Sequence, residues 1–369
     1  MILAGGGHTH LEVLRRFAAR PLAGVKITVV TRAPETPYSG MLPGWIAGHY
    51  GREEVHVDLE PVVREAGASL RIAEVTGLDP DRRRLHLDGA PSLLFDLLSL
   101  NVGSAPTGMR LDGAMECGLP VRPTEAFLSR LLSMVGDPSS PARALAGDRL
   151  RIAFVGGGVT AVEVALAVKY RLRDQGVDLM LFTEDDEPLS SLSPGARARL
   201  LRVLSRRGIR VRTKSRVAKV GPRGPIIVDG EEVEVDVTVL ATGAEAPPWV
   251  EESGLALDPR GFVAVDAALR STSHPHVFAA GDVSTVLPHP RPKAGVFAVR
   301  QGPPLHANLE RALLDKEPRP FQPQSVFLTL VSTGDRYAVG GRGRWSFEGR
   351  WVWYLKDWID RRWMSRWRL

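Results

Sequence analysis

Two glycine triplets are the residues of this sequence that are best suited to bind a charged ligand. Each triplet follows a short apolar segment and precedes an amphipathic one, so the chain turns there from a strand into a helix. Such a turn leaves the first N–H groups of the helix unpaired, and glycines let the backbone approach a pyrophosphate, whose negative charge the helix dipole favours. Two such turns predict two dinucleotide sites, the alternative being two plain tight turns. The triplets are Gly5, Gly6 and Gly7, and Gly156, Gly157 and Gly158.

Both turns depart from the full G-x-G-x-x-G pattern at its third glycine. The second turn has Ala161 there, which is an accepted variant, whereas the first has His10. Histidine is unusual at this position because the site normally lets the helix and the strand pack closely. His8 and His10 therefore have two interpretations: they contact a phosphate, or they only cap and pad the start of the helix.

An acidic residue is expected at the end of the second strand of each unit, where it binds a ribose. In the second unit this residue is Glu184, the first of four consecutive acids at 184–187. Their charge would repel a ribose phosphate, which favours NADH over NADPH; the alternative is a solvated acidic turn. The first unit has Thr31 and Arg32 at the equivalent positions, so the acid expected for the adenosine ribose of that unit is missing.

The elements that must position these turns occur twice in the same order. The first unit has a strand over 1–4, a helix after the glycines, a strand over 25–30 and a closing segment over 95–106. The second has a strand over 150–155, a helix over 159–173, a strand over 177–182 and a closing segment over 235–247. This repeat predicts an α/β fold with two Rossmann-like domains built on parallel sheets. A further helix is expected at 295–308, and the segment 136–149, rich in Pro, Ser, Gly and Ala, is expected to be a surface loop.

The totals agree with a globular protein whose positive charge suits nucleic acid, an anionic membrane surface or anionic cofactors. The chain has 369 residues, a net charge of +6 and 44% hydrophobic residues, enough for two domains. Cys117 is its one cysteine, which excludes an intrachain disulfide and a CxxC redox pair. The first residues lack the features of a signal peptide, and no segment is apolar over the length that a membrane span requires. We therefore expect a cytoplasmic protein, and any contact with the membrane would be at its inner face.

Six motifs together carry a resemblance to a known family. They are GGGHTHLEVL, YSGMLPGWIAGHY, VGGGVTAVEVA, VLATG, VFAAGDVS and PKAGVFAVRQG. With them the sequence resembles the FAD-dependent pyridine nucleotide-disulfide oxidoreductase superfamily, including type II NADH:quinone oxidoreductases, sulfide:quinone reductases and the flavoprotein module associated with selenophosphate synthetase. The resemblance implies a glutathione-reductase-like fold of two domains plus a short C-terminal α+β region. The FAD domain would comprise 1–107 and 248–317, the NAD(H) domain 108–247, and the C-terminal region 318–369.

The resemblance also implies roles for individual residues. Asp282 would hydrogen-bond the ribityl chain of FAD, and Lys293 would face the pyrimidine end of the flavin, where a positive charge stabilises the reduced form; the alternative for Lys293 is a surface lysine. Glu163 would lie near the flavin and assist proton or hydride steps, the alternative being an ordinary acid near a helix start. The remaining residues implied to bind FAD or NAD(H) are the two glycine triplets, His8, His10, Tyr38, Ser39, Gly40, Met41, Leu42, Pro43, Gly103, Glu184, Gly243, Gly281, Ala294 and Gly295.

One departure from the family narrows the reaction. Sulfide:quinone reductases and disulfide reductases use paired redox cysteines, and this chain has a single cysteine. We therefore expect an enzyme without a metal site that transfers a hydride from NADH directly to FAD and then reduces a quinone or similar small acceptor. The alternative is a flavoprotein reductase that serves selenium or selenophosphate metabolism or a protein electron acceptor.

The C-terminal segment 345–369 combines six tryptophans with several arginines. On a helix, Trp351, Tyr354, Leu355, Trp358 and Ile359 share one stripe. Aromatic rings beside basic groups suit a membrane interface. The alternative, which we favour because aromatic stripes usually pack inside a protein, is that the stripe contacts the FAD domain or forms a homodimer interface. Nucleic acid is not expected as a partner, because no recognition fold accompanies these residues.

Overall fold

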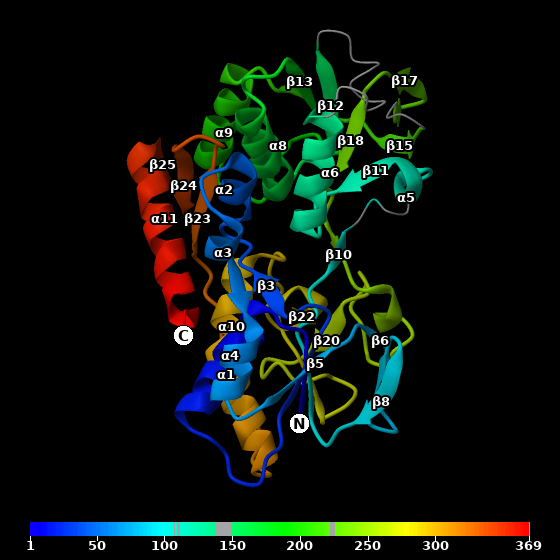
Figure 1. The fold of residues 1–369 in the computed structure, drawn as a ribbon, viewed down its shortest axis with the longest axis vertical. Coiled ribbons are helices and arrows are strands. Elements are labelled where there is room, and N and C mark those ends of the chain that lie inside the picture. Colours follow the sequence, from blue (N-terminus) through cyan, green and yellow to red (C-terminus); the bar gives the residue numbers. More distant parts are fainter. Residues whose placement is uncertain (107, 109–110, 137–148, 222–225, 369) are drawn as a thin grey trace.

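The computed structural model of the chain describes residues 1–106, 108, 111–136, 149–221 and 226–368. Figure 1 shows two α/β lobes one above the other, with the C-terminal helix lying along the side of both. Residues 137–148, which are most of the loop predicted at 136–149, lie outside the described residues. No helix of the described part of the chain is long and apolar enough to cross a membrane.

The first lobe is built on a sheet of five parallel strands in the order β21-β9-β1-β2-β5. Strands β1, β9 and β21 are buried at every residue, as expected for a parallel sheet covered on both faces. Helices α1 and α10 contact each other beside this sheet (Figure 1). The elements are β1 (Ile2–Ala4), β2 (Thr28–Thr31), β5 (Ser69–Ile72), β9 (Leu98–Leu100), β21 (Val277–Ala279), α1 (His8–Ala19), α4 (Leu59–Glu65) and α10 (Gly295–Leu313).

The second lobe repeats this arrangement with the sheet order β11-β18-β12-β13-β14, again all parallel. In both lobes the strand before the glycine turn is central, with the second strand of the unit on one side and the closing strand on the other. The predicted α/β fold with two Rossmann-like units is therefore confirmed. The elements are β11 (Gly118–Pro120), β12 (Leu150–Val155), β13 (Val177–Phe182), β14 (Arg210–Arg212), β18 (Val237–Leu240), α6 (Thr124–Gly136), α8 (Val159–Arg171) and α9 (Pro194–Arg206).

Smaller elements connect and cover the two lobes. The antiparallel pair of β10 and β19 joins them, because the chain passes from the first lobe to the second through β10 and returns through β19 (Figure 1). The bounds are β3 (Glu35–Pro37), β4 (His56–Asp58), β6 (Val75–Asp79), β7 (Arg84–Leu87), β8 (Ala90–Leu94), β10 (Ala105–Pro106), β15 (Val217–Val220), β16 (Ile226–Val228), β17 (Glu231–Val233), β19 (Ala244–Glu245), β20 (Val263–Val265), β22 (Ser284–Val286), α2 (Leu42–Ala47), α3 (Arg52–Val55), α5 (Ala114–Cys117), η1 (Pro248–Val250) and η2 (Gly281–Val283).

Some predicted bounds differ from the structure. The second strand of the first unit lies at Thr28–Thr31 instead of 25–30, and the helix of the second unit ends at Arg171 instead of 173. The helix predicted at 295–308 continues to Leu313, although Pro303 and Pro304 each remove a backbone donor. Residues beyond these prolines, such as Leu305 and Leu309, are fully buried, and their burial stabilises the longer helix.

The C-terminal region is α+β, as predicted. Three antiparallel strands precede a helix that contacts the sheet and lies beside α2, α3 and the first lobe (Figure 1). The elements are β23 (Leu328–Ser332), β24 (Ala338–Arg342), β25 (Trp345–Gly349), α11 (Arg350–Met364) and η3 (Ser365–Trp367).

The aromatic stripe does not pack against the FAD domain through its largest rings, so that half of the favoured interpretation is wrong, whereas the homodimer interface stays a prediction. Trp351, Tyr354 and Trp358 are 57%, 49% and 58% exposed. The opposite face of α11 is buried instead, through residues such as Trp353 and Trp363. Sequence periodicity finds a stripe but does not say which face a helix turns inward when both faces carry large aromatic rings.

Candidate functional site

The first glycine turn connects β1 to α1 at the carboxyl edge of the first sheet. Gly5 has a φ of +101°, and a Cβ there would lie 2.3 Å from the carbonyl oxygen of Asn101. A Cβ on Gly7 would lie 2.2 Å from the Asn101 side chain, so both positions require glycine. Helix α1 begins without a side-chain cap and without an acid in its first turn. Its first N–H groups thus face an edge where a pyrophosphate fits, which is the arrangement that FAD requires.

Asn101 holds this edge together, and its role could not be foreseen from the sequence. Its side chain accepts from the backbone N–H of His10 at 3.4 Å and donates to the carbonyl of Ala280 at 2.8 Å, so it links three segments distant in the sequence. A Cβ on Gly281, which has a φ of +72°, would lie 2.5 Å from the same amide. In the sequence, the one feature that points to Asn101 is its position as a polar residue directly after the strand at 98–100.

His10 is structural, and of its two interpretations the padding role fits. One ring nitrogen lies 2.7 Å from the carbonyl of Gly5 and the other 2.8 Å from the hydroxyl of Ser99. Burial lowers the pKa of His10 to about 4, so the ring is neutral at physiological pH. With both nitrogens hydrogen-bonded inside the lobe, the imidazole has nothing left for a phosphate.

Asp282 lies at the same carboxyl edge, in η2 directly after β21. Arg122 of the second lobe approaches its carboxylate at 3.7 Å and donates to the hydroxyl of Ser104 at 3.3 Å. Gly103, with a φ of +78°, immediately precedes this serine, and a Cβ there would meet open space. The structure therefore brings Asp282 and Gly103 together with an arginine from the other lobe, which sequence reasoning missed.

Lys293 does not extend freely into solvent. Its ammonium donates to the carbonyl of Ser284 and to the hydroxyl of Thr285, and lies 3.8 Å from the centre of the Phe262 ring. Burial lowers the pKa of Lys293 to about 8, against the attraction of Asp282. The surface alternative is thus excluded, whereas a contact with the flavin stays a prediction. Ala294 is the N-cap of α10, which has no side-chain cap either.

The segment from Tyr38 to Pro43 lies between the start of α10 and the end of α11. A Cβ on Gly295 would lie 2.8 Å from the Ser39 hydroxyl, which shows how closely the two segments approach. The ring of Tyr38 stacks on Trp363 at 4.2 Å, and His8 contacts both rings at 5.2–5.3 Å. Burial lowers the pKa of His8 to about 4, so His8 acts here as a neutral ring. The rest of the segment is Gly40, the buried Met41, and Leu42 and Pro43 at the start of α2.

Glu163 belongs to a buried charged cluster that joins α8 to the C-terminal region. Its carboxylate accepts from the backbone N–H of Ser332 at 2.8 Å, and burial raises the pKa of Glu163 to about 7 despite the nearby ammonium of Lys356. Lys356 donates to Asp360 at 2.7 Å, and Asp360 accepts from the hydroxyl of Tyr38 at 3.1 Å. A carboxyl that titrates near neutral pH can hold or release a proton under physiological conditions. The cluster therefore connects Glu163 to the Tyr38 segment.

The second glycine turn has the same construction. Gly156 has a φ of +133°, and a Cβ there would lie 2.4 Å from the carbonyl oxygen of Ala241, on the segment that leads to Gly243. A Cβ on Gly157 would lie 2.4 Å from the Thr183 hydroxyl, whereas one on Gly158 would meet open space. Helix α8 starts at Val159, and its N-cap, Gly158, provides no side-chain cap; the first turn has no acid. This edge also fits a pyrophosphate.

Four acids follow β13, and they differ in their partners. Asp186 pairs with Lys214 at 3.6 Å, Glu187 pairs with Arg197, and Asp185 accepts from the Thr183 hydroxyl. Glu184 is exposed, and its carboxylate has no hydrogen-bond or ion-pair partner within the described ranges. Of the four acids, Glu184 is thus the one whose carboxylate is available, and its contact with a ribose stays a prediction.

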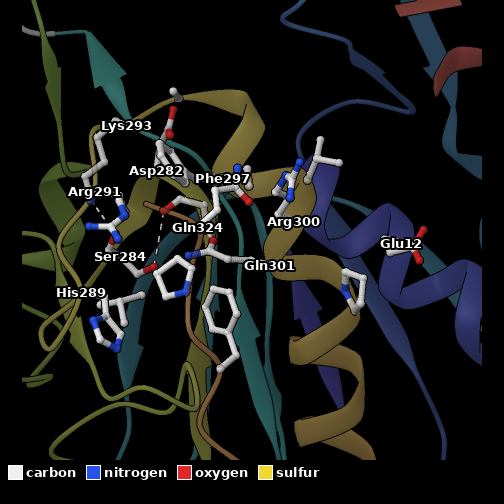
Figure 2. A pocket seen from close by; sticks show the side chains of 18 of the residues that line it. Glu12, Asp282, Ser284, His289, Arg291, Lys293, Phe297, Arg300, Gln301 and Gln324 are labelled. Atoms are coloured by element: carbon white, nitrogen blue, oxygen red, sulfur yellow. Dashed lines mark hydrogen bonds between the residues drawn. The ribbon is translucent and has the colours of Figure 1, made fainter. Parts of the chain in front are cut away.

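A pocket of about 880 Å³ adjoins the first of these edges. Asp282 and Ala294 line it together with residues of α1, α10, the loop before α10 and the segment 321–324 (Figure 2). Two C-terminal residues, Trp363 and Arg366, also line it.

Comparison with known proteins gives a consistent answer. The family model described as pyridine nucleotide-disulphide oxidoreductase matches residues 1–302. A segment covering 62% of this chain is 31% identical to an NADH dehydrogenase-like protein of Mycobacterium tuberculosis, and it spans 58% of that relative. A type II NADH:quinone oxidoreductase of Staphylococcus epidermidis is 23% identical over 98% of this chain and 94% of its own. In fold, the chain is similar to NDH2 from Plasmodium falciparum, with a TM-score of 0.82, 12% identity, and 99% and 96% of the two chains covered.

Proposed function

Because the chain belongs to the pyridine nucleotide-disulphide oxidoreductase family, we propose that it is an FAD-dependent enzyme that oxidises NADH and reduces a quinone or a similar small acceptor. The observation that carries this proposal is the pair of uncapped helix N-termini, each at a glycine turn on the carboxyl edge of a parallel sheet. Each N-terminus is suited to one dinucleotide. An enzyme that passes electrons from NADH to FAD needs both sites.

The division of labour follows the two lobes. Residues 1–107 and 248–317 would hold FAD through the first turn and Asp282, and residues 108–247 would hold NADH through the second turn. Glu184 would accept from the ribose hydroxyls of NADH, because the neighbouring acids already have partners. The bound flavin would supply the electron chemistry, while the chain supplies binding, orientation and protons.

Glu163 is the residue that we propose for proton handling. Reduction of a quinone to a hydroquinone takes up two electrons and two protons, and NADH provides two electrons and one proton. The second proton has to come from the solvent through the protein. A carboxyl with a pKa of about 7, hydrogen-bonded inside the protein beside Lys356, suits this task.

The acceptor is reached without redox cysteines. Cys117, the single cysteine, ends the short helix α5 in the second lobe and packs beside an apolar cluster there. For a lipophilic quinone, we propose that the exposed rings of Trp351, Tyr354 and Trp358 contact the membrane surface, where amphipathic aromatic rings are favoured. Arg362, whose guanidinium lies 5.6 Å from the Trp358 ring, would add attraction to anionic lipids.

The test is a titration of the purified protein loaded with FAD, followed by visible absorbance in the absence of oxygen. We expect NADH to bleach the flavin band and a quinone to restore it, and NADPH to bleach it far more slowly. Retention of the flavin by the purified chain tests the first glycine turn separately. A flavin that stays oxidised with excess NADH would contradict the proposed activity and leave only the cofactor assignment.

A further inference from the structure

The pocket of about 880 Å³ has features that the proposed function does not use. It is lined by residues of both α1 and α10, and in Figure 2 Arg291, Lys293 and His289 lie on one side of it, Arg300 and Glu12 on the other. Its apolar lining includes the rings of Phe297, Phe321 and Trp363. A flat ring compound fits such a lining, since rings pack on aromatic side chains.

The charge of the pocket lining is strongly positive. Five arginines, one lysine and two acidic residues line it, and both acids already have basic partners. Glu12 is held by Arg15 at 2.8 Å and by Arg16 at 2.7 Å, and Asp282 faces Arg122 at 3.7 Å. A ligand in this pocket therefore meets a surplus of positive charge, which favours an anion.

Two buried donors in the pocket lining have no partner in the described structure. They are the Nε of Arg291 and the amide nitrogen of Gln324, both of them shielded from solvent. A buried donor left unpaired is destabilising, so native proteins rarely retain one without a reason. Both groups can only donate through these atoms, so an acceptor oxygen of a ligand would satisfy them. A guanidinium and an amide together suit a carboxylate.

We infer that this pocket receives the electron acceptor and that the acceptor is a ring compound carrying an acidic group, bound through Arg291 and Gln324. This inference rests on the proposed function, because Asp282 and Ala294, which are proposed to hold FAD, also line the pocket. The reaction balances as NADH, one proton and the ring quinone giving NAD⁺ and the hydroquinone. The acidic group itself is not changed; it fixes the ring in the pocket.

The experiment uses two probes with the same ring and different charge, anthraquinone-2-carboxylate and its neutral carboxamide. Binding to the oxidised, FAD-loaded protein is measured by calorimetry without NADH, and kcat/KM is measured with NADH. We expect the carboxylate to bind about tenfold more tightly than the carboxamide and to show a similarly higher kcat/KM. Arg291→Gln and Gln324→Leu should each remove most of this preference. Arg64→Gln, an exposed change on α4, should keep it.

The outcomes separate this inference from the proposed function. Equal binding of the two probes, or a preference that survives both pocket substitutions, overturns the inference, even if NADH reduces the flavin and neutral quinones reoxidise it. Selective binding without a higher kcat/KM for the carboxylate also overturns it, because the anion site would then not be the acceptor site. Failure of NADH to bleach the flavin contradicts the proposed activity, whereas calorimetry still decides whether the pocket selects anions.

Discussion

Replacement of Glu163 by glutamine should make the protein more stable at alkaline pH. The folded protein holds the Glu163 carboxyl in its neutral form up to a pKa of about 7, whereas the ordinary value is 4.5. Between pH 4.5 and pH 7, unfolding therefore releases a proton. The stability associated with this group is fully present below pH 4.5 and is lost as the pH rises through 7.

The magnitude follows from the pKa of the buried carboxyl. Since one pKa unit corresponds to about 1.4 kcal/mol, ionising Glu163 in the folded protein lowers the free energy of unfolding by about 3 kcal/mol. Glutamine has nearly the same shape and its oxygen can still accept from the backbone N–H of Ser332, so the substitution removes the charge and keeps the hydrogen bond. Alanine would instead leave that N–H unpaired.

The assay is urea unfolding followed by tryptophan fluorescence at several values between about pH 5 and pH 8, because the pKa difference acts over this range. The free energy of unfolding of E163Q minus that of the unsubstituted protein should rise over this range and then level off. Glu65→Gln, an exposed change on α4, should give no such rise.

Parallel pH profiles for E163Q and the unsubstituted protein would refute the reasoning, because they would mean that Glu163 titrates alike in the folded and the unfolded chain. The pH dependence of acceptor reduction gives a second readout. The rate should fall above about pH 7 in the unsubstituted enzyme, and E163Q should be slow without this dependence.

Three further predictions concern the nucleotide site, the flavin site and the surface of α11. Glu184→Gln should raise the KM for NADH about tenfold with little change in kcat, because ribose contacts are lost equally in the ground and transition states. Steady-state kinetics check this, and an unchanged KM would mean that another group binds the ribose. Asn101→Leu should remove the hydrogen bond to the Ala280 carbonyl, lower the free energy of unfolding by about 1–3 kcal/mol in a urea titration, and lower flavin retention, measured as the ratio of flavin to protein absorbance. Full retention of FAD would show that the edge does not depend on this amide. Serine at both Trp351 and Trp358 should reduce sedimentation with anionic vesicles while NADH still bleaches the flavin, and unchanged sedimentation would exclude this face as the membrane contact.

Sequence reasoning predicted the parts of the fold that depend on local patterns. The glycine turns follow from the requirement for a positive φ at Gly5 and Gly156 and for close approach to the facing strands, and these constraints are visible in the residue types. The repeat of strand, turn and helix then dictated two parallel sheets. The bounds of the second strand were missed, since the apolar residues Val25 and Ile27 precede the paired segment that begins at Thr28.

Contacts between distant segments were not predictable in the same way. Arg122 reaches Asp282 from the other lobe, and Asn101 links the first turn to the segment after β21. Neither Arg122 nor Asn101 stands out in the sequence by residue type or spacing. The packing of the lobes determines which residues they contact. Lys356 and Asp360 belong to the same class: as a Lys–Asp pair four residues apart on a helix they look like a surface ion pair, yet they form a buried one.

The two faces of α11 decide how the membrane hypothesis has to be tested. One face presents Trp351 and Trp358 to solvent, whereas the other carries Lys356 and Asp360, which lie beside Glu163 and the Tyr38 hydroxyl. Deletion of residues 345–369 would remove both faces, and the loss of a buried cation near Glu163 would destabilise the fold and alter its proton chemistry. Loss of quinone reduction after such a deletion would thus support either interpretation of the tail. Substitution of the exposed tryptophans alone separates them, because it leaves the buried cluster intact and changes only the surface available to a membrane.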